Sequence, residues 1–282
     1  MSDESLIKLL VRIRDEGINE ARTHGLSSVA EATGIPNWCL TQAVLFRVAN
    51  IAVWGFEDGK ELSLEEVIKE VVKGVSGKPE ALKLLCREVD ALVKRVLGNA
   101  GSDGRAPVFV DVGCGSGLAL ALIANHPSIK GGVEPRLIGV DHDPRMIKAL
   151  KVMLPQAIPI QASAESLPLR PSVADAVLSI GMVHEVSNVK AFIGSVARVL
   201  RDGGEVLVAD SFAPPLTAAI MRVGRRVRVA MSKGPENPWG LNEVLDVLKS
   251  SGLRTRYARR LGSSVLRTYP AIIVAVKGPE GG

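Results

Sequence analysis

The residues best suited to chemistry form a glycine-rich stretch around an acidic residue. A β-branched run at 108–112 contains Asp111, and three glycines follow at alternate positions within 113–117. Glycine lets the backbone turn sharply and lets a ligand lie against the main chain, where a Cβ would collide. A helix-forming run at 118–124 comes next, and the start of a helix offers free N–H groups to a polar or anionic ligand group. The stretch therefore predicts a strand, a tight turn and a helix that bind a ligand.

The glycine spacing argues against a dinucleotide as that ligand. A dinucleotide-binding turn needs glycine at its first, third and sixth positions. Counted from Gly113, the sixth position is Leu118, so the pattern fails there. The kind of ligand therefore has to be inferred from the elements around the turn.

Short apolar runs alternate with helical patterns after residue 107. The predicted strands are 108–112, 137–140, 157–161, 174–180, 205–209 and 271–276, with a turn at 202–204 before the fifth. This alternation is typical of a mainly parallel sheet covered by helices on both faces. Ligands of such sheets bind beyond the carboxyl ends of the strands. The residues at or just after those ends are Asp111, Asp141, Ser163, Ile180 and Asp210.

The first hundred residues are expected to be helical throughout, because apolar residues recur there at helical spacing. The small, polar stretch at 99–107 predicts a boundary between a helical domain at 1–104 and a second domain at 105–282. Residues 28–45 resemble a helix-turn-helix unit, but the second helix of the unit is strongly apolar. A place in a core or an interface is therefore favoured over DNA binding. We expect the helical domain to cap the site or to mediate a homodimer.

Residues 111–117, Asp-Val-Gly-Cys-Gly-Ser-Gly, resemble motif I of the class I S-adenosylmethionine-dependent methyltransferases. Four further segments look like the later motifs of that family and follow in its order, at 138–141, 161–168, 174–185 and 198–204. Order and spacing resemble the ubiquinone/menaquinone-biosynthesis type of methyltransferase domain. The resemblance implies an α/β fold with a Rossmann-like, doubly wound, mainly parallel seven-stranded sheet. It also implies S-adenosylmethionine as the cofactor.

The resemblance assigns roles to individual residues. Asp141 would accept hydrogen bonds from the two ribose hydroxyls of the cofactor, as a carboxylate does in dinucleotide folds. The 113–117 backbone would approach the methionine part, and Asp111 would order that turn and meet the ammonium group through water. Ser163 stands where the family usually has an aspartate that accepts from adenine, and Glu165 either replaces part of that function or is a solvated loop carboxylate. The cofactor-binding residues predicted in this way are Asp111, Gly113, Cys114, Gly115, Gly117, Asp141, His142, Ser163, Ala164 and Ile180.

Methyl transfer from a sulfonium is an in-line displacement, so alignment of the reacting atoms supplies much of the acceleration. A protein base is needed only where the acceptor must lose a proton. His184, beside Glu185 just after the fourth predicted strand, is the first candidate for that base, and Asp210 is the second. The alternative is that His184 only lines the pocket. Cys114 is expected to be a small filler of the turn, and no metal site is expected.

The acceptor is expected to be a small molecule. Residues 211–240 form an insertion that is typical of an acceptor lid, and 218–231 reads as a basic amphipathic helix. From residue 211 onward the chain has 12 Lys and Arg against 4 Asp and Glu, which indicates a solvated basic face or an anionic partner. RNA is the alternative partner. Many RNA methyltransferases carry an Asn/Asp-Pro-Pro-aromatic motif after the fourth strand, and 180–183 reads Ile-Gly-Met-Val instead. A binding module without catalysis is the third hypothesis.

The cysteines and the N-terminus indicate a cytoplasmic location. The three cysteines lie far apart and match no metal spacing, so a disulfide is expected to be improbable and the surroundings reducing. The N-terminus lacks the basic start and apolar middle of a signal peptide. No apolar run approaches the length of about 20 residues that a membrane span requires.

Overall fold

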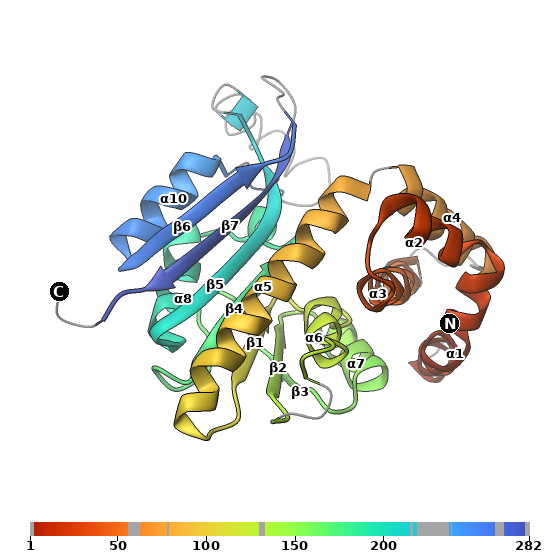
Figure 1. The fold of residues 1–282 in the computed structure, drawn as a ribbon, viewed down its shortest axis with the longest axis horizontal. Coiled ribbons are helices and arrows are strands. Elements are labelled where there is room, and N and C mark those ends of the chain that lie inside the picture. Colours follow the sequence, from red (N-terminus) through yellow and green to blue (C-terminus); the bar gives the residue numbers. More distant parts are fainter. Residues whose placement is uncertain are drawn as a thin grey trace. The chain divides into compact units, whose positions relative to one another are not determined.

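The structure is a computed structural model that describes residues 3–55, 63–77, 79–129, 133–214, 217–218, 237, 239–262 and 268–279. The chain divides into two compact units, residues 1–161 and residues 162–282. The ribbon in Figure 1 follows the chain from the N-terminal helices to the last strand.

The first unit begins with the helices α1 (Asp3–Thr23), α2 (Leu26–Thr33), α3 (Asn37–Gly55), α4 (Leu64–Gly77) and α5 (Pro79–Asp103). The prediction of helices throughout this part is therefore confirmed for the described residues. Helix α3 is apolar on nearly all sides and contacts α1, α4 and α6. This helix is the second helix of the segment that resembles a helix-turn-helix unit. Its residues Leu40, Val44 and Leu45 are buried, as expected for a helix in a core.

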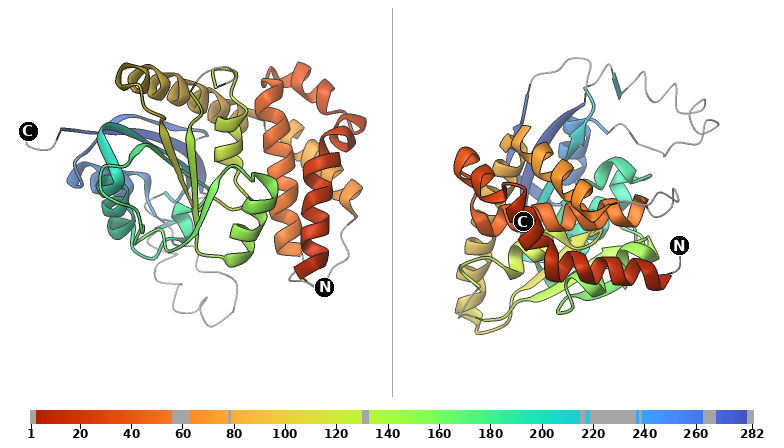
Figure 2. Two further views of the ribbon diagram at one scale, coloured as in Figure 1. Left: turned by 90° about the horizontal axis from the view of Figure 1, so that it is seen from below. Right: turned by 90° about the vertical axis from the view of Figure 1, so that its right-hand side faces the viewer.

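The strands of the first unit are β1 (Val108–Val112), β2 (Arg136–Asp141) and β3 (Ile158–Gln161). They are parallel, with Asp111 opposite Gly139 and Asp141 opposite Gln161. Helices α6 (Leu118–Ala124) and α7 (Pro144–Met153) connect them. These two helices contact the strands, and they also contact α3, while α7 contacts α1, so α6 and α7 lie between the strands and the helices α1 and α3 (Figure 2).

The second unit contains β4 (Ala174–Ile180), the short 3-10 helix η1 (Val183–Glu185), α8 (Val189–Val199), β5 (Leu200–Phe212), α10 (Leu241–Ser250), β6 (Leu253–Arg260) and β7 (Tyr269–Lys277). Strands β4 and β5 are parallel, whereas β7 is antiparallel to both β5 and β6. Helices α8 and α10 contact each other, and they contact β5 and β6 respectively (Figure 1).

The strand order in the seven-stranded sheet is β3-β2-β1-β4-β5-β7-β6. This is a Rossmann-like arrangement, mostly parallel, with β7 as the antiparallel strand. The predicted α/β class and strand number are confirmed. The predicted domain boundary between residues 104 and 105 stays a prediction.

One predicted feature of the sheet was wrong. The expected turn at 202–204 is part of β5, because the strand continues through a bulge. Leu200 pairs with Ala174, and the next partners are Glu205 and Ala176. Gly203 has a φ of 75°, in the left-handed region where glycine is favoured. A local Asp-Gly-Gly sequence is equally compatible with a turn and with a bulge, and only the pairing with β4 decides between them.

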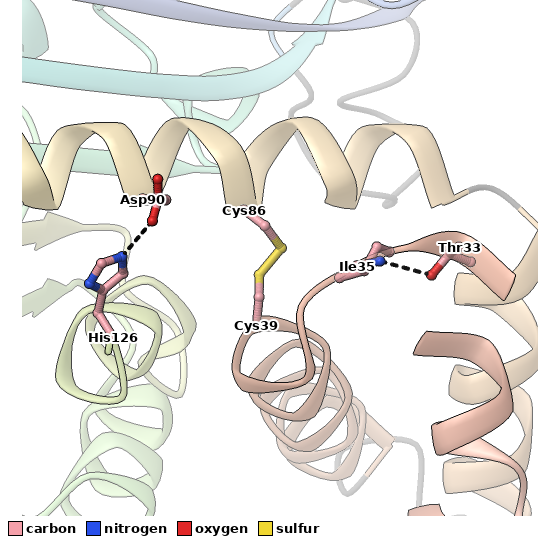
Figure 3. The surroundings of a disulfide bond; sticks show 6 residues. All are labelled: Thr33, Ile35, Cys39, Cys86, Asp90 and His126. Atoms are coloured by element: carbon pink, nitrogen blue, oxygen red, sulfur yellow. Dashed lines mark hydrogen bonds and ion pairs between the residues drawn. A yellow bond between two sulfur atoms is a disulfide. The ribbon is translucent and has the colours of Figure 1, made fainter. Parts of the chain in front are cut away.

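The expectation about disulfides was also wrong. Cys39 on α3 and Cys86 on α5 form a disulfide, with their Cα atoms 6.0 Å apart (Figure 3). The two cysteines are 47 positions apart in the chain, so their spacing carries no signal of the pairing. No helix in the described part of the chain is long and apolar enough to cross a membrane. The predicted lid helix at 218–231 lies outside the described residues, apart from Ala218.

Candidate functional site

The glycine turn follows β1 and is held against β2. Gly113, Gly115 and Gly117 have φ values of 71°, 52° and 107°, which other residues rarely adopt. The amides of Gly113 and Cys114 both donate to the Val140 carbonyl, at 2.8 and 3.0 Å. The alternate glycines of the sequence are therefore required by the backbone conformation of the turn.

Cys114 fills space on the inner side of this turn. Its side chain is buried, and its Sγ lies 3.0 Å from the point where Gly139 would carry a Cβ. Burial, followed by the negative charges of Asp111 and Asp141, raises the pKa of the Cys114 thiol. The thiol is thus kept protonated, which agrees with the expected role as a small filler.

Asp141 connects β2 to the glycine turn. Its Oδ2 accepts from the Gly115 amide at 2.8 Å, and its Oδ1 accepts from the Asp143 amide at 2.9 Å. Each carboxylate oxygen has a second lone pair, so both can still accept from a ligand hydroxyl. The next residue, His142, has an exposed ring 3.6 Å from the carboxylate. Asp141 therefore links the glycine turn to the end of β2.

Asp111 is the second carboxylate beneath the turn, and it is 2% exposed. Burial and the neighbouring charge of Asp141 raise the pKa of Asp111 to about 8. A pKa of about 8 favours the protonated form of the Asp111 carboxyl at neutral pH. A cation above the turn would replace the stabilisation that the proton provides. This is the electrostatic setting that an ammonium or sulfonium group requires.

Ser163 and Glu165 belong to the second unit. The Ser163 hydroxyl accepts from the Glu165 amide at 3.2 Å. The Glu165 carboxylate accepts from the amides of Ser187 and Asn188 at 2.9 and 2.8 Å, just before α8. Glu165 therefore stabilises the start of α8, a role that neither of the two sequence alternatives included. Ala164 lies between the two residues.

His184 and Asp210 form a hydrogen-bonded pair in the second unit. The sequence presented them as separate candidates, but His184 Nδ1 lies 2.8 Å from Asp210 Oδ1. Asp210 also accepts from the His184 amide at 3.2 Å and from the Ser211 amide at 2.6 Å. Ile180, at the end of β4, precedes this pair by one short turn. A neutral imidazole that donates from Nδ1 has Nε2 as its acceptor, which is the atom a general base uses.

Two residues near the end of the insertion hold the His184 turn. The Asn237 amide donates to the His184 carbonyl at 2.6 Å, and the Asn237 side chain donates to the Val186 carbonyl at 2.8 Å. Trp239 Nε1 donates to the same carbonyl at 3.0 Å, and its own carbonyl accepts from Ala213 at 3.0 Å. No sequence pattern indicated this role, because it depends on contacts between distant segments.

A cavity of about 420 Å³ lies next to this segment in the second unit. Its wall includes Ala213, which follows Asp210 by three residues, and Gly240, which directly follows Trp239. Leu241, Tyr269 and Arg260 also line it, with the Arg260 guanidinium 3.7 Å from the centre of the Tyr269 ring. Cavities of this size are typical of small-molecule sites. Among the described side chains, no group of three His, Cys, Asp or Glu residues is arranged to hold a metal ion.

The structure therefore gathers the predicted residues into two groups. In the first unit, the glycine turn, Asp111, Cys114, Asp141 and His142 are brought together. In the second unit, His184 and Asp210 are paired. Two residues of the first unit that sequence reasoning missed, Phe46 and Asn50, contact the glycine turn through Ser116.

Comparison with known proteins finds similarity to methyltransferases. A family model described as a methyltransferase domain matches residues 110–208. An uncharacterized methyltransferase of Mycobacterium tuberculosis is 34% identical over 97 residues, so the matched part spans 34% of this chain and 37% of that relative. A ubiquinone/menaquinone biosynthesis C-methyltransferase of Syntrophotalea carbinolica is 30% identical over 185 residues, which cover 57% of this chain and 74% of that relative.

A solved structure is similar over a longer part of the chain. It belongs to a candidate sarcosine dimethylglycine methyltransferase from Galdieria sulphuraria and matches with a TM-score of 0.53. The match covers 81% of this chain and 96% of the other, at 14% sequence identity. At that identity the likeness supports the fold.

Proposed function

Because this chain belongs to the S-adenosylmethionine-dependent methyltransferases, the family that includes the ubiquinone/menaquinone biosynthesis C-methyltransferases, we propose that it methylates a small-molecule acceptor. The observation that carries the proposal is the bond between the Gly115 amide and Asp141 at 2.8 Å. This bond joins the glycine turn, the cradle that would hold the methionine part of the cofactor, to the carboxylate that would hold the ribose. The cavity of about 420 Å³ and the quinone-biosynthesis relative support a small acceptor.

The residues of the first unit fit the cofactor. Gly113, Gly115 and Gly117 of the turn carry no Cβ. Asp111 lies on the strand that leads into the turn, and Asp141 accepts from the Gly115 amide. Asp141 would bind the ribose hydroxyls, and Asp111 would attract the ammonium group. When bound, S-adenosylmethionine supplies an electrophilic methyl group on a positively charged sulfur.

The residues of the second unit fit the task of accepting a proton. Asp210 fixes the His184 ring through Nδ1 at 2.8 Å, so the ring is held in one orientation. His184 Nε2 would take a proton from an acceptor hydroxyl or an acidic C–H group, which would make that acceptor atom a better nucleophile toward the methyl group that the cofactor supplies. We propose that His184 is the base and that Asp210 orients it.

A labelling experiment tests the proposed acceptor class. The protein is incubated with cell extract and S-adenosylmethionine labelled in its methyl group, and the label is followed into small molecules, RNA and protein. We expect the label in the small-molecule fraction. Label in RNA would favour the basic last quarter of the chain as an RNA-binding surface, and binding without any transfer would favour a module without catalysis.

The cofactor site has a separate test. Asp141→Ala removes both acceptor oxygens below the glycine turn, so we expect cofactor binding measured by calorimetry to fall at least tenfold. Asp143→Ala, two residues later, removes a helix cap and a nearby carboxylate but leaves Asp141 in place, and it serves as the control. Unchanged binding by a folded Asp141→Ala protein would refute the proposed site.

A further inference from the structure

The start of helix α3 is linked to α5 and to the end of α6 within the first unit. Cys39 in its first turn is joined to Cys86 on α5 (Figure 3). Asp90, one turn further along α5, lies 3.0 Å from His126 Nε2. The His126 ring in turn packs edge-on against Trp38 of α3, with ring centres 5.0 Å apart. The start of α3, the middle of α5 and the end of α6 are thereby tied together.

The later part of α3 contacts the glycine turn. The amide of Ser116 donates to Asn50 Oδ1 at 3.0 Å, and the hydroxyl of Ser116 donates to the Phe46 carbonyl at 3.1 Å. Phe46 and Asn50 are four residues apart, so they lie on one face of the helix. Ser116 is fully buried by these contacts. Because an amide N–H requires an acceptor, the bond also assigns the oxygen of the Asn50 side chain.

Asn50 also lies against the open side of Gly115. A Cβ built on Gly115 would lie 3.2 Å from Asn50 Oδ1 and 3.4 Å from Nδ2. The Gly115 amide points the other way, to Asp141 at 2.8 Å. The two central residues of the turn are thus held by two different side chains: Gly115 by Asp141 after β2, and Ser116 by Asn50 on α3.

We propose that Asn50 is a positioning residue for the cofactor, and that the N-terminal helices contribute through it to the cofactor site. The inference rests on the proposed role of the glycine turn as the cofactor cradle. Asn50 keeps the Ser116 amide directed away from the ligand and fixes the left-handed conformation of Gly115. Without Asn50, the turn must be ordered when the cofactor binds, and this cost weakens binding.

The test compares two variants of Asn50 with a matched control. Asn50→Ala deletes the acceptor, whereas Asn50→Asp keeps an oxygen of the same reach for the Ser116 amide. Asn19→Ala makes the same deletion at an exposed position of α1. One hydrogen bond is worth about 0.5–1.5 kcal/mol, so we expect Asn50→Ala to weaken binding of S-adenosylhomocysteine in calorimetry by roughly 2- to 12-fold. We expect Asn50→Asp and Asn19→Ala to stay within about twofold of the parent protein.

Thermal unfolding without cofactor separates positioning from a loss of fold. A positioning role predicts weaker binding of the cofactor by an Asn50→Ala protein that still unfolds cooperatively above the assay temperature. Once an acceptor is known, it also predicts a raised KM for the cofactor with kcat unchanged. Equal binding by Asn50→Ala and the parent protein would overturn the inference, and so would equal weakening by Asn50→Ala and Asn50→Asp. Asp141→Ala is measured alongside: if it binds normally, the cofactor site itself is wrong, whereas loss in Asp141→Ala alone rejects only the role of Asn50.

Discussion

At the scale of single residues, the site is dominated by two carboxylates with different environments. Asp141 accepts two backbone hydrogen bonds, from the amides of Gly115 and Asp143. Asp111 is buried beside it, and burial together with the charge of Asp141 raises the pKa of Asp111 to about 8. One carboxylate is therefore suited to bind hydroxyl groups, and the other is poised to exchange a proton for a cation.

The raised pKa of Asp111 predicts a pH-dependent affinity for the cofactor. Below about pH 8 the free protein must release a proton from Asp111 before the carboxylate can pair with the ammonium group. The affinity for the cofactor should therefore rise by up to about tenfold per pH unit between pH 6 and pH 8, and then level off. Calorimetry at several pH values measures this dependence. Asp111→Asn is the control, because it lacks the titrating carboxyl, whereas the titration of the cofactor itself affects both proteins equally. The same pH dependence of cofactor affinity in both proteins would contradict the proposed pairing of Asp111 with the ammonium group.

The His184–Asp210 pair predicts a loss of turnover that leaves cofactor binding intact. General base catalysis contributes about 10²- to 10⁴-fold, so His184→Ala should lower kcat by at least about 10²-fold. The cofactor affinity should change little, since the predicted cradle lies around Asp141. Glu185→Gln alters the neighbouring carboxylate, 3.9 Å from His184 Nε2, and should retain most of the activity. Full activity of His184→Ala with the identified acceptor would show that the acceptor needs no protein base.

At the scale of elements, α3 combines two functions that the sequence did not connect. Its buried apolar residues make it a central helix of the first unit, and its residues Phe46 and Asn50 hold the glycine turn. The disulfide ties the same helix to α5 at Cys39. The stability of the first unit and the geometry of the turn therefore depend on one helix.

The disulfide should contribute measurably to stability. It closes a loop of 47 residues, for which restriction of the unfolded chain gives roughly 2–4 kcal/mol. We expect the denaturation midpoint of the parent protein to fall when a thiol reductant is added. The double variant Cys39→Ser with Cys86→Ser should be less stable and insensitive to the reductant. A parent protein whose midpoint is the same with and without reductant would show that the bond contributes nothing.

At the scale of the whole molecule, the basic excess of the last quarter is partly used within the fold. Arg256 pairs with the buried Glu205 at 3.0 Å, and Arg260 stacks on Tyr269. These contacts give two of the arginines a structural function on β6 and β7. They therefore weaken the case for an RNA-binding surface and leave the labelling experiment to identify the acceptor.

Most of the local structure of this protein could be inferred from short stretches of its sequence. The apolar runs indicated every strand except β6, which is rich in arginine, and the alternate glycines indicated a left-handed turn after Asp111. The side-chain pairs of the site, in contrast, depend on how the helices and strands pack. Asn50 and Ser116 are 66 residues apart, Cys39 and Cys86 are 47 apart, and His184 and Asp210 are 26 apart. Such pairs form because packed elements bring distant segments together, and no periodicity or spacing along the chain records that placement.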